Sequence, residues 1–124
     1  MAQKILIVED NEQNMILLRD VIKYQGYTVI TARNGTDGIR LAREERPDLI
    51  IMDIQMPVMD GATAIKIVRS DPELQKIKVV ACTSFAMSGD KERLLQAGFD
   101  DYLAKPLDVR QLREMVSRHL DGKE

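Results

Sequence analysis

Four small groups of polar residues each follow a short apolar run of the sequence. They are the acidic pair Glu9-Asp10, the single Asp53, the hydroxyl pair Thr83-Ser84, and Lys105 before a proline. If the carboxylates met, like charges about 4 Å apart would repel by about 4 kcal/mol at an effective dielectric constant near 20. A cation must then balance them. Oxygen ligands without His or Cys favour a hard divalent ion such as Mg²⁺.

These residue types suit the transfer of a phosphoryl group to a carboxylate. One carboxylate would act as nucleophile, while Mg²⁺ and Lys105 would neutralise the phosphoryl oxygens, and a hydroxyl and backbone N–H groups would hold them. Asp53 is the best candidate nucleophile because it stands alone, whereas Glu9 and Asp10 are adjacent and better placed to hold the ion. Each group also has a plainer interpretation, as a helix cap, a turn or a surface residue.

The apolar runs that precede these residues predict buried β-strands. They are short and rich in β-branched residues, and the segments between them carry apolar residues at helical spacing. Asn11 or Glu12 marks the start of the first helix and Gly26 its end, Gly98 closes the fourth, and Asp108 precedes the fifth as a plausible N-cap. The predicted strands cover residues 4–8, 28–32, 49–52, 79–82 and 102–104.

Strands that alternate with helices predict an α/β fold. Units of this kind build a parallel sheet with right-handed crossovers and helices on both faces, which is a three-layer α/β/α sandwich. The carboxyl ends of parallel strands lie at one edge of the sheet, where such folds bind their ligands. We therefore expect Glu9, Asp10, Asp53, Thr83 and Lys105 to share one pocket at that edge.

Composition limits the function further. The chain has 124 residues, 44% of them hydrophobic, which predicts one domain over residues 1–124. A net charge of −2 argues against direct binding of nucleic acid. One cysteine, Cys82, and one histidine, His119, exclude an internal disulfide and a Cys/His zinc site. Without a long apolar run or a signal peptide, we expect a cytoplasmic protein with no membrane contact.

The order and spacing of the motifs closely resemble the receiver domain of two-component response regulators, including the stand-alone, chemotaxis-regulator-like type. The resemblance covers nearly all of the chain. It rests on the motifs Ile5-Leu-Ile-Val-Glu-Asp10-Asn, Pro47-Asp-Leu-Ile-Ile-Met-Asp53-Ile-Gln-Met-Pro57, Asp60-Gly61, Thr83-Ser84 and Lys105-Pro106-Leu. It implies a flavodoxin-like fold with five parallel strands in the order 2-1-3-4-5.

The resemblance also implies a metal site and a phosphoacceptor. Asp53 would receive a phosphoryl group from a phosphohistidine. Asp10, Asp53 and the backbone carbonyl of Gln55 would bind Mg²⁺ directly, with Mn²⁺ as a substitute, and Glu9 would act mainly through metal-bound water. Lys105 would pair with a phosphoryl oxygen. The Lys105-Pro106 peptide is expected to be cis.

Three further residues are implied as parts of a switch. Thr83 would move toward the new phosphate, and the backbone N–H of Ser84 would contact another phosphoryl oxygen. Tyr102 would turn inward as Thr83 moves. Phe85, two residues after Thr83, is expected to shield the phosphate from water.

The implied function is a phosphorylation-activated switch in a two-component system or phosphorelay. Its partners would be a sensor histidine kinase or histidine phosphotransfer protein and a downstream protein target, bound through the fourth helix, fifth strand and fifth helix. A monomer and a phosphorylation-dependent dimer are both compatible with this role. The sequence stops at Glu124, soon after the last predicted helix, so we expect a stand-alone regulator or a domain cut from a larger protein.

Other functions fit the sequence less well. An aspartyl-phosphate phosphatase typically has a second aspartate two residues after the nucleophile, where this chain has Gln55, so we expect no turnover of an external substrate. A pseudo-receiver would lack part of the acidic and lysine set. A flavin or nucleotide binder would have a glycine-rich loop after the first strand, where Glu9, Asp10 and Asn11 stand instead.

Overall fold

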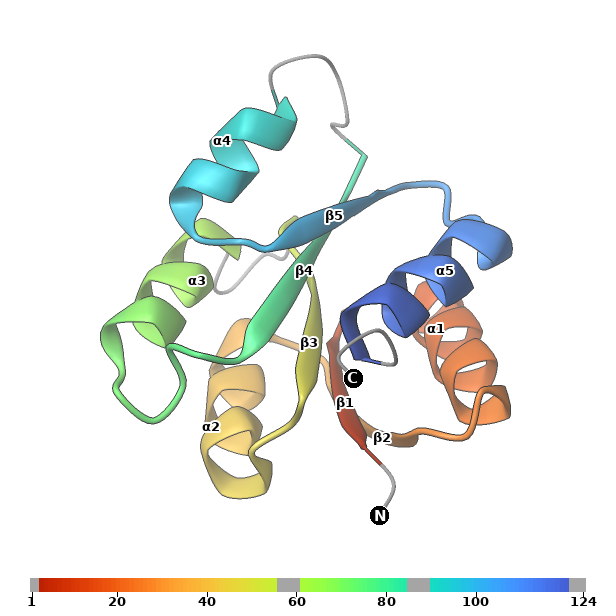
Figure 1. The fold of residues 1–124 in the computed structure, drawn as a ribbon, viewed down its shortest axis with the longest axis horizontal. Coiled ribbons are helices and arrows are strands. Elements are labelled where there is room, and N and C mark those ends of the chain that lie inside the picture. The colour runs from red at the N-terminus through yellow and green to blue at the C-terminus, as the bar shows by residue number, and fades with distance from the viewer. Residues whose placement is uncertain (1–2, 56–60, 85–89, 121–124) are drawn as a thin grey trace.

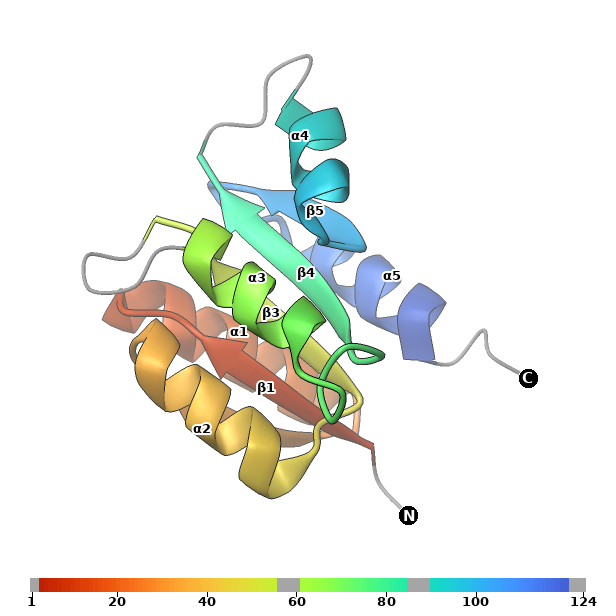
Figure 2. The same ribbon diagram turned by 90° about the vertical axis from the view of Figure 1, so that its left-hand side faces the viewer.

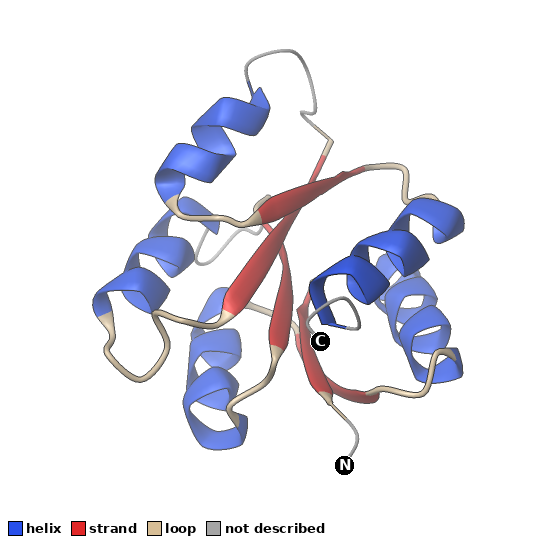
Figure 3. Cartoon of the chain, in the orientation of Figure 1, coloured by secondary structure: helices blue, strands red, loops and turns tan. Residues whose placement is uncertain are grey.

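A parallel sheet with helices on both faces places the polar residues. The computed structural model describes residues 3–55, 61–84 and 90–120. Strands and helices alternate along these ranges (Figure 3). The strands are β1 (Lys4–Val8), β2 (Thr28–Ala32), β3 (Leu49–Asp53), β4 (Lys78–Thr83) and β5 (Asp101–Ala104). The helices are α1 (Glu12–Tyr24), α2 (Gly35–Glu45), α3 (Gly61–Ser70), α4 (Asp90–Ala97) and α5 (Val109–Leu120).

The sheet has the predicted topology. Its strands pair in parallel in the order β2-β1-β3-β4-β5, which confirms the doubly wound, flavodoxin-like arrangement. Figure 2 shows β1 and β4 running in the same direction. In the paired register Met52 lies opposite Val8 on one side and Ala81 on the other. Because the strands are parallel and in register, their carboxyl ends lie side by side.

Alternating side chains of the strands divide the core into two halves. Residues such as Leu6, Ile50 and Val79 pack against α2 and α3 on one face, together with Leu94 of α4. Their neighbours, such as Ile7 and Ile51, pack against α1 and α5 on the other face. Figure 1 shows these two layers on opposite sides of the sheet. The inner strands are therefore buried on both faces, as continuous apolar runs predict.

Side-chain caps fix where the helices begin. Asn11 Oδ1 accepts from the Asn14 N–H at 2.9 Å at the start of α1, and Asp108 Oδ1 accepts from the Gln111 N–H at 3.0 Å at the start of α5. Gly26 and Gly98 follow α1 and α4 with positive φ angles of 99° and 121°. None of the helices in the described ranges is both long and apolar enough to cross a membrane.

Replacing Ile51 by alanine should destabilise the fold strongly. Ile51 is 0% exposed in β3, between β1 and β4, so truncation leaves a cavity and should cost about 2–5 kcal/mol of the free energy of unfolding. Ile16→Ala is the matched control, because Ile16 on α1 is 40% exposed and should lose far less. Urea unfolding of both variants checks this, and equal losses would contradict the two-sided burial of β3.

Candidate functional site

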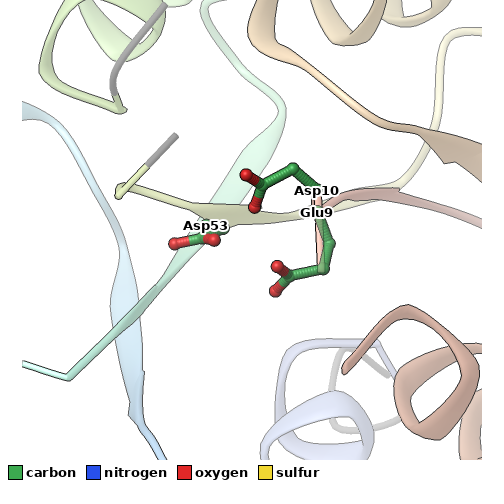
Figure 4. A group of neighbouring side chains, drawn as sticks. All are labelled: Glu9, Asp10 and Asp53. Carbon is green, nitrogen blue, oxygen red and sulfur yellow. The ribbon is translucent and has the colours of Figure 1, made fainter. Parts of the chain in front are cut away.

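Three carboxylates lie together at the carboxyl ends of β1 and β3, as the sequence predicted. Glu9, Asp10 and Asp53 each offer an oxygen, and these oxygens lie within 4.8 Å of one another. Figure 4 shows the three side chains at the ends of the two adjacent strands. Glu9 is only 1% exposed and Asp53 only 2%, whereas Asp10 is exposed. Two nearly buried carboxyl groups and one exposed group therefore form a compact cluster of oxygen ligands.

Backbone hydrogen bonds continue past the strand ends and hold this edge in place. The Glu9 N–H donates to the Ala32 carbonyl at 3.0 Å, and the Ile54 N–H donates to the Cys82 carbonyl at 3.2 Å. The Lys105 N–H donates to the Thr83 carbonyl at 2.8 Å. The residues that carry the functional side chains are thus fixed by the same ladder of hydrogen bonds as the sheet itself.

Lys105 contributes a positively charged side chain to the site. Its Nζ lies 3.1 Å from Asp53 Oδ2 and 3.7 Å from Glu9 Oε1, and only 15% of the side chain is exposed. Burial alone would lower the pKa of Lys105, but the hydrogen bond to Asp53 and the charges of both carboxylates outweigh it and raise that pKa. The Lys105-Pro106 peptide is cis, as the resemblance implied.

One carboxyl oxygen of Glu9 accepts a hydrogen bond, and the other makes the ion-pair contact with Lys105. Its Oε2 accepts from the Asn11 N–H at 3.1 Å, while its buried Oε1 has no hydrogen-bond partner among the described residues. Burial raises the pKa of Glu9 to about 7, the Asn11 N–H opposes this, and the Asp53 carboxylate adds to it. A buried carboxyl oxygen in this state fits a metal ion or a metal-bound water, so the donor set suits Mg²⁺.

The predicted switch residues lie at the end of β4 and on β5. Thr83 is the last residue of β4 and is fully buried. Tyr102 on β5 is half-buried and packs against the core half that faces α2 and α3, and its proposed movement stays a prediction. The implied shield Phe85 lies outside the described residues. So do Pro57 and Asp60 of the family motifs.

The structure gives Ser84 a partner that the sequence did not predict. Its backbone N–H, assigned from the resemblance to a phosphoryl oxygen, donates to Gln55 Oε1 at 3.0 Å. The Gln55 N–H itself donates to Asp53 Oδ1 at 2.9 Å. Gln55 was singled out for its backbone carbonyl and for its place two residues after Asp53, but nothing in the sequence indicated where its amide group would lie.

Cys82 lies next to the site but takes no part in its chemistry. It is paired with Asp53 in the register of β3 and β4 and is 0% exposed. Burial raises the pKa of its thiol far above the ordinary value, and the negative charge of Glu9 adds to this. The thiol therefore stays protonated and behaves as a small apolar group, which confirms the prediction from its apolar strand.

Arg69 is a structural residue that the sequence pattern did not reveal. Its guanidinium donates to the carbonyls of Gly98 and Ile77 at 2.8 and 2.7 Å and to Asp100 Oδ2 at 2.8 Å. These bonds tie the end of α3 to the segments that enter β4 and β5. A single arginine at the end of an amphipathic helix carries no signal that distinguishes this role from a solvated charge.

Comparisons with known proteins define the family. The sequence model of the response regulator receiver domain family matches residues 5–117, so the chain belongs to this family. The chain is 48% identical over 120 residues to the polar-differentiation response regulator DivK of Brucella anthropi, with 97% of this chain and 98% of the relative covered. Receiver domains of response regulators act in two-component signalling, where they interact with histidine kinases and downstream targets.

Solved structures agree with this assignment. A putative response regulator from Chloroflexus aurantiacus is 30% identical with a TM-score of 0.91, covering 98% of this chain and 99% of that one. The chemotaxis response regulator CheY4 of Vibrio cholerae is 28% identical with a TM-score of 0.90, covering 97% of this chain and 100% of that one.

One solved relative bears on the acidic cluster. The receiver domain of the sensor histidine kinase PA1611 from Pseudomonas aeruginosa is 36% identical with a TM-score of 0.88, covering 98% of this chain and 99% of that one. It is described with a magnesium ion coordinated in its active site cleft. The acidic cluster of this chain is compatible with such a site.

The raised pKa of Glu9 predicts a pH dependence of stability. A carboxyl group whose pKa rises from 4.5 to about 7 on folding favours the folded state below pH 4.5 and loses that contribution as pH rises through 7. Without divalent ions, the melting temperature of the wild type should therefore fall relative to that of Glu9→Gln between pH 5 and pH 8. Thermal unfolding in EDTA measures the difference, and a constant difference across this range would contradict the burial of an ionisable Glu9.

Proposed function

We propose that this chain is a phosphorylation-activated switch whose phosphoacceptor is Asp53. The phosphoryl donor is a phosphohistidine on a sensor histidine kinase or a histidine phosphotransfer protein, and such a donor places the chain in the cytoplasm. Phosphorylation changes the surface formed by α4, β5 and α5 and so controls the binding of a downstream protein. The chain promotes its own phosphorylation and dephosphorylation and turns over no separate substrate.

The observation that carries this proposal is the environment of the Asp53 carboxylate. Asp53 Oδ2 lies 3.1 Å from Lys105 Nζ, and ligand oxygens of Glu9 and Asp10 lie within 4.8 Å of those of Asp53. An ion pair that served only to stabilise the fold would need just Lys105 and one carboxylate. Here three carboxylates meet one lysine, so the cluster of these four side chains keeps an excess of negative charge that a divalent cation would balance.

The chemistry is a displacement at phosphorus. A carboxylate oxygen of Asp53 forms the new P–O bond as the P–N bond of the phosphohistidine breaks, and the imidazole nitrogen leaves with the electron pair and takes a proton from solvent. Asp10, Asp53 and the Gln55 carbonyl would hold Mg²⁺, with Glu9 reaching it through water. When bound, the ion supplies positive charge to the phosphoryl oxygens. Lys105 stays protonated beside Asp53 and orients a phosphoryl oxygen.

A path of contacts leads from the site to the proposed output surface. Thr83 at the end of β4 is linked to β5 by the hydrogen bond from the Lys105 N–H. At the other end of β5, Asp101 Oδ2 contacts the guanidinium of Arg118 and lies 3.0 Å from His119 Nε2, both on α5. A shift of β5 after phosphorylation would therefore be transmitted to α5 through polar contacts as well as through the core.

Replacing Asp53 by asparagine should abolish phosphorylation. Incubation with acetyl phosphate and Mg²⁺ should add one phosphoryl group to the wild type, measured as intact-protein mass after rapid acid quenching. Asp53→Asn keeps the shape of the side chain but removes the carboxylate nucleophile, so it should give no adduct. Wild type without divalent ions should give little or none.

Asp20→Asn provides the matched control, because Asp20 is an exposed aspartate on α1 and should leave the adduct unchanged. An adduct of equal yield on Asp53→Asn would contradict the assignment of the phosphoacceptor. If the wild type forms no adduct with acetyl phosphate or with a phosphohistidine donor, the chain acts as a pseudo-receiver that binds its partners without phosphorylation.

A further inference from the structure

Gln55 contacts two parts of the site, one through its side chain and one through its backbone. Its Oε1 accepts from the Ser84 N–H at 3.0 Å, and its backbone N–H donates to Asp53 Oδ1 at 2.9 Å. Gln55 follows β3 and Ser84 follows β4, and these strands are neighbours in the sheet (Figure 1). Before phosphorylation, one amide side chain therefore ties the exit of β3 to the exit of β4.

The Ser84 N–H cannot serve two acceptors well at once. A backbone amide has one hydrogen, which makes one strong hydrogen bond. The resemblance to receiver domains implies that this hydrogen binds an oxygen of the phosphoryl group on Asp53. In the structure it is already engaged by Gln55, so the amide oxygen must leave before the phosphoryl oxygen can bind.

We propose that the Gln55 side chain is a stand-in for the phosphoryl group, which holds the Ser84 N–H in the unphosphorylated state and is displaced on phosphorylation. This inference rests on the proposed function and deepens it, because it makes Gln55 a positioning residue that weakens phosphoryl binding. The exchange favours the phosphoryl group, since an N–H binds an anionic oxygen more strongly than a neutral amide oxygen. Gln55 and Ser84 are both exposed, so water solvates the released amide.

The displacement also changes which group links β3 to β4. Before phosphorylation the Gln55 side chain makes this link from a position two residues beyond Asp53. After phosphorylation, the phosphoryl group on Asp53 makes this link by binding the N–H of Ser84, the residue that follows β4. The contact at Ser84 thus passes from a neutral, solvent-exposed side chain to a charged group that lies deeper in the site, at a residue that is 2% exposed.

The first experiment tests the contact alone, in protein without phosphoryl group or divalent ion. Amide exchange and the ¹H chemical shift of the Ser84 N–H are measured by NMR in wild type, Gln55→Met and Gln55→Asn. Methionine keeps the length without the acceptor, and asparagine keeps the amide but is one methylene shorter. Both variants should exchange faster at Ser84 and shift upfield. Gln75→Met, an exposed glutamine before β4, should match the wild type. Unchanged Ser84 signals in both Gln55 variants would overturn the proposal.

The second experiment tests the displacement. Trifluoroberyllate, a tetrahedral mimic of the phosphoryl group, is titrated at Mg²⁺ concentrations that saturate each protein. Gln55→Met should bind it about two- to tenfold more tightly than wild type, because no hydrogen bond to the Ser84 N–H has to be broken first. Equal or weaker binding would overturn the stand-in role.

The two experiments separate this inference from the proposed function. If trifluoroberyllate binds to neither wild type nor Gln55→Met, the proposed function fails and the displacement step fails with it, whatever the Ser84 signals show. If the mimic binds to both proteins with equal affinity while the Ser84 N–H is released in the variant, only the stand-in role of Gln55 is wrong.

Discussion

The crowding of negative charge at the carboxyl edge of the sheet is the constraint on which the rest of the site depends. Glu9 and Asp53 are almost fully buried with their oxygens close together, and the backbone ladder prevents them from moving apart. Lys105 neutralises part of this charge, while burial, with a smaller contribution from the Asp53 carboxylate, raises the pKa of Glu9 to about 7. Binding of a divalent cation would offset the repulsion between these carboxylates, so ion binding at this site would also stabilise the fold.

The same edge explains how a local event could reach a distant surface. The site residues lie at the ends of β1, β3, β4 and β5, so a group added to Asp53 acts on several strands at once. The Gln55 contact to Ser84 keeps the exits of β3 and β4 together before that event, and Asp101 connects β5 to α5. The core halves pack the sheet between two layers of helices, so a shift that begins at this edge would pass along β5 to α5.

The fold and the centre of the site followed from the sequence because each had a strong local signal. The apolar run before Asp53 predicted a buried strand, and parallel strands necessarily bring Glu9, Asp53 and Lys105 to one edge. Asp108 was identified as a helix cap because caps use a short, regular pattern. The partner of the Ser84 N–H could not be predicted in this way. It depends on the rotamer of Gln55 and on the exact spacing of two loops, and neither leaves a pattern in the sequence.

The central claim is that Asp53 carries the phosphoryl group, and chemical trapping tests it most directly. Borohydride reduces an acyl phosphate on aspartate to homoserine, which peptide mass spectrometry locates along the chain. After incubation with a phosphohistidine donor and Mg²⁺, we expect homoserine at position 53, and none when Mg²⁺ is omitted. Homoserine at position 10 instead, or at several acidic residues in equal amount, would contradict the account of the site.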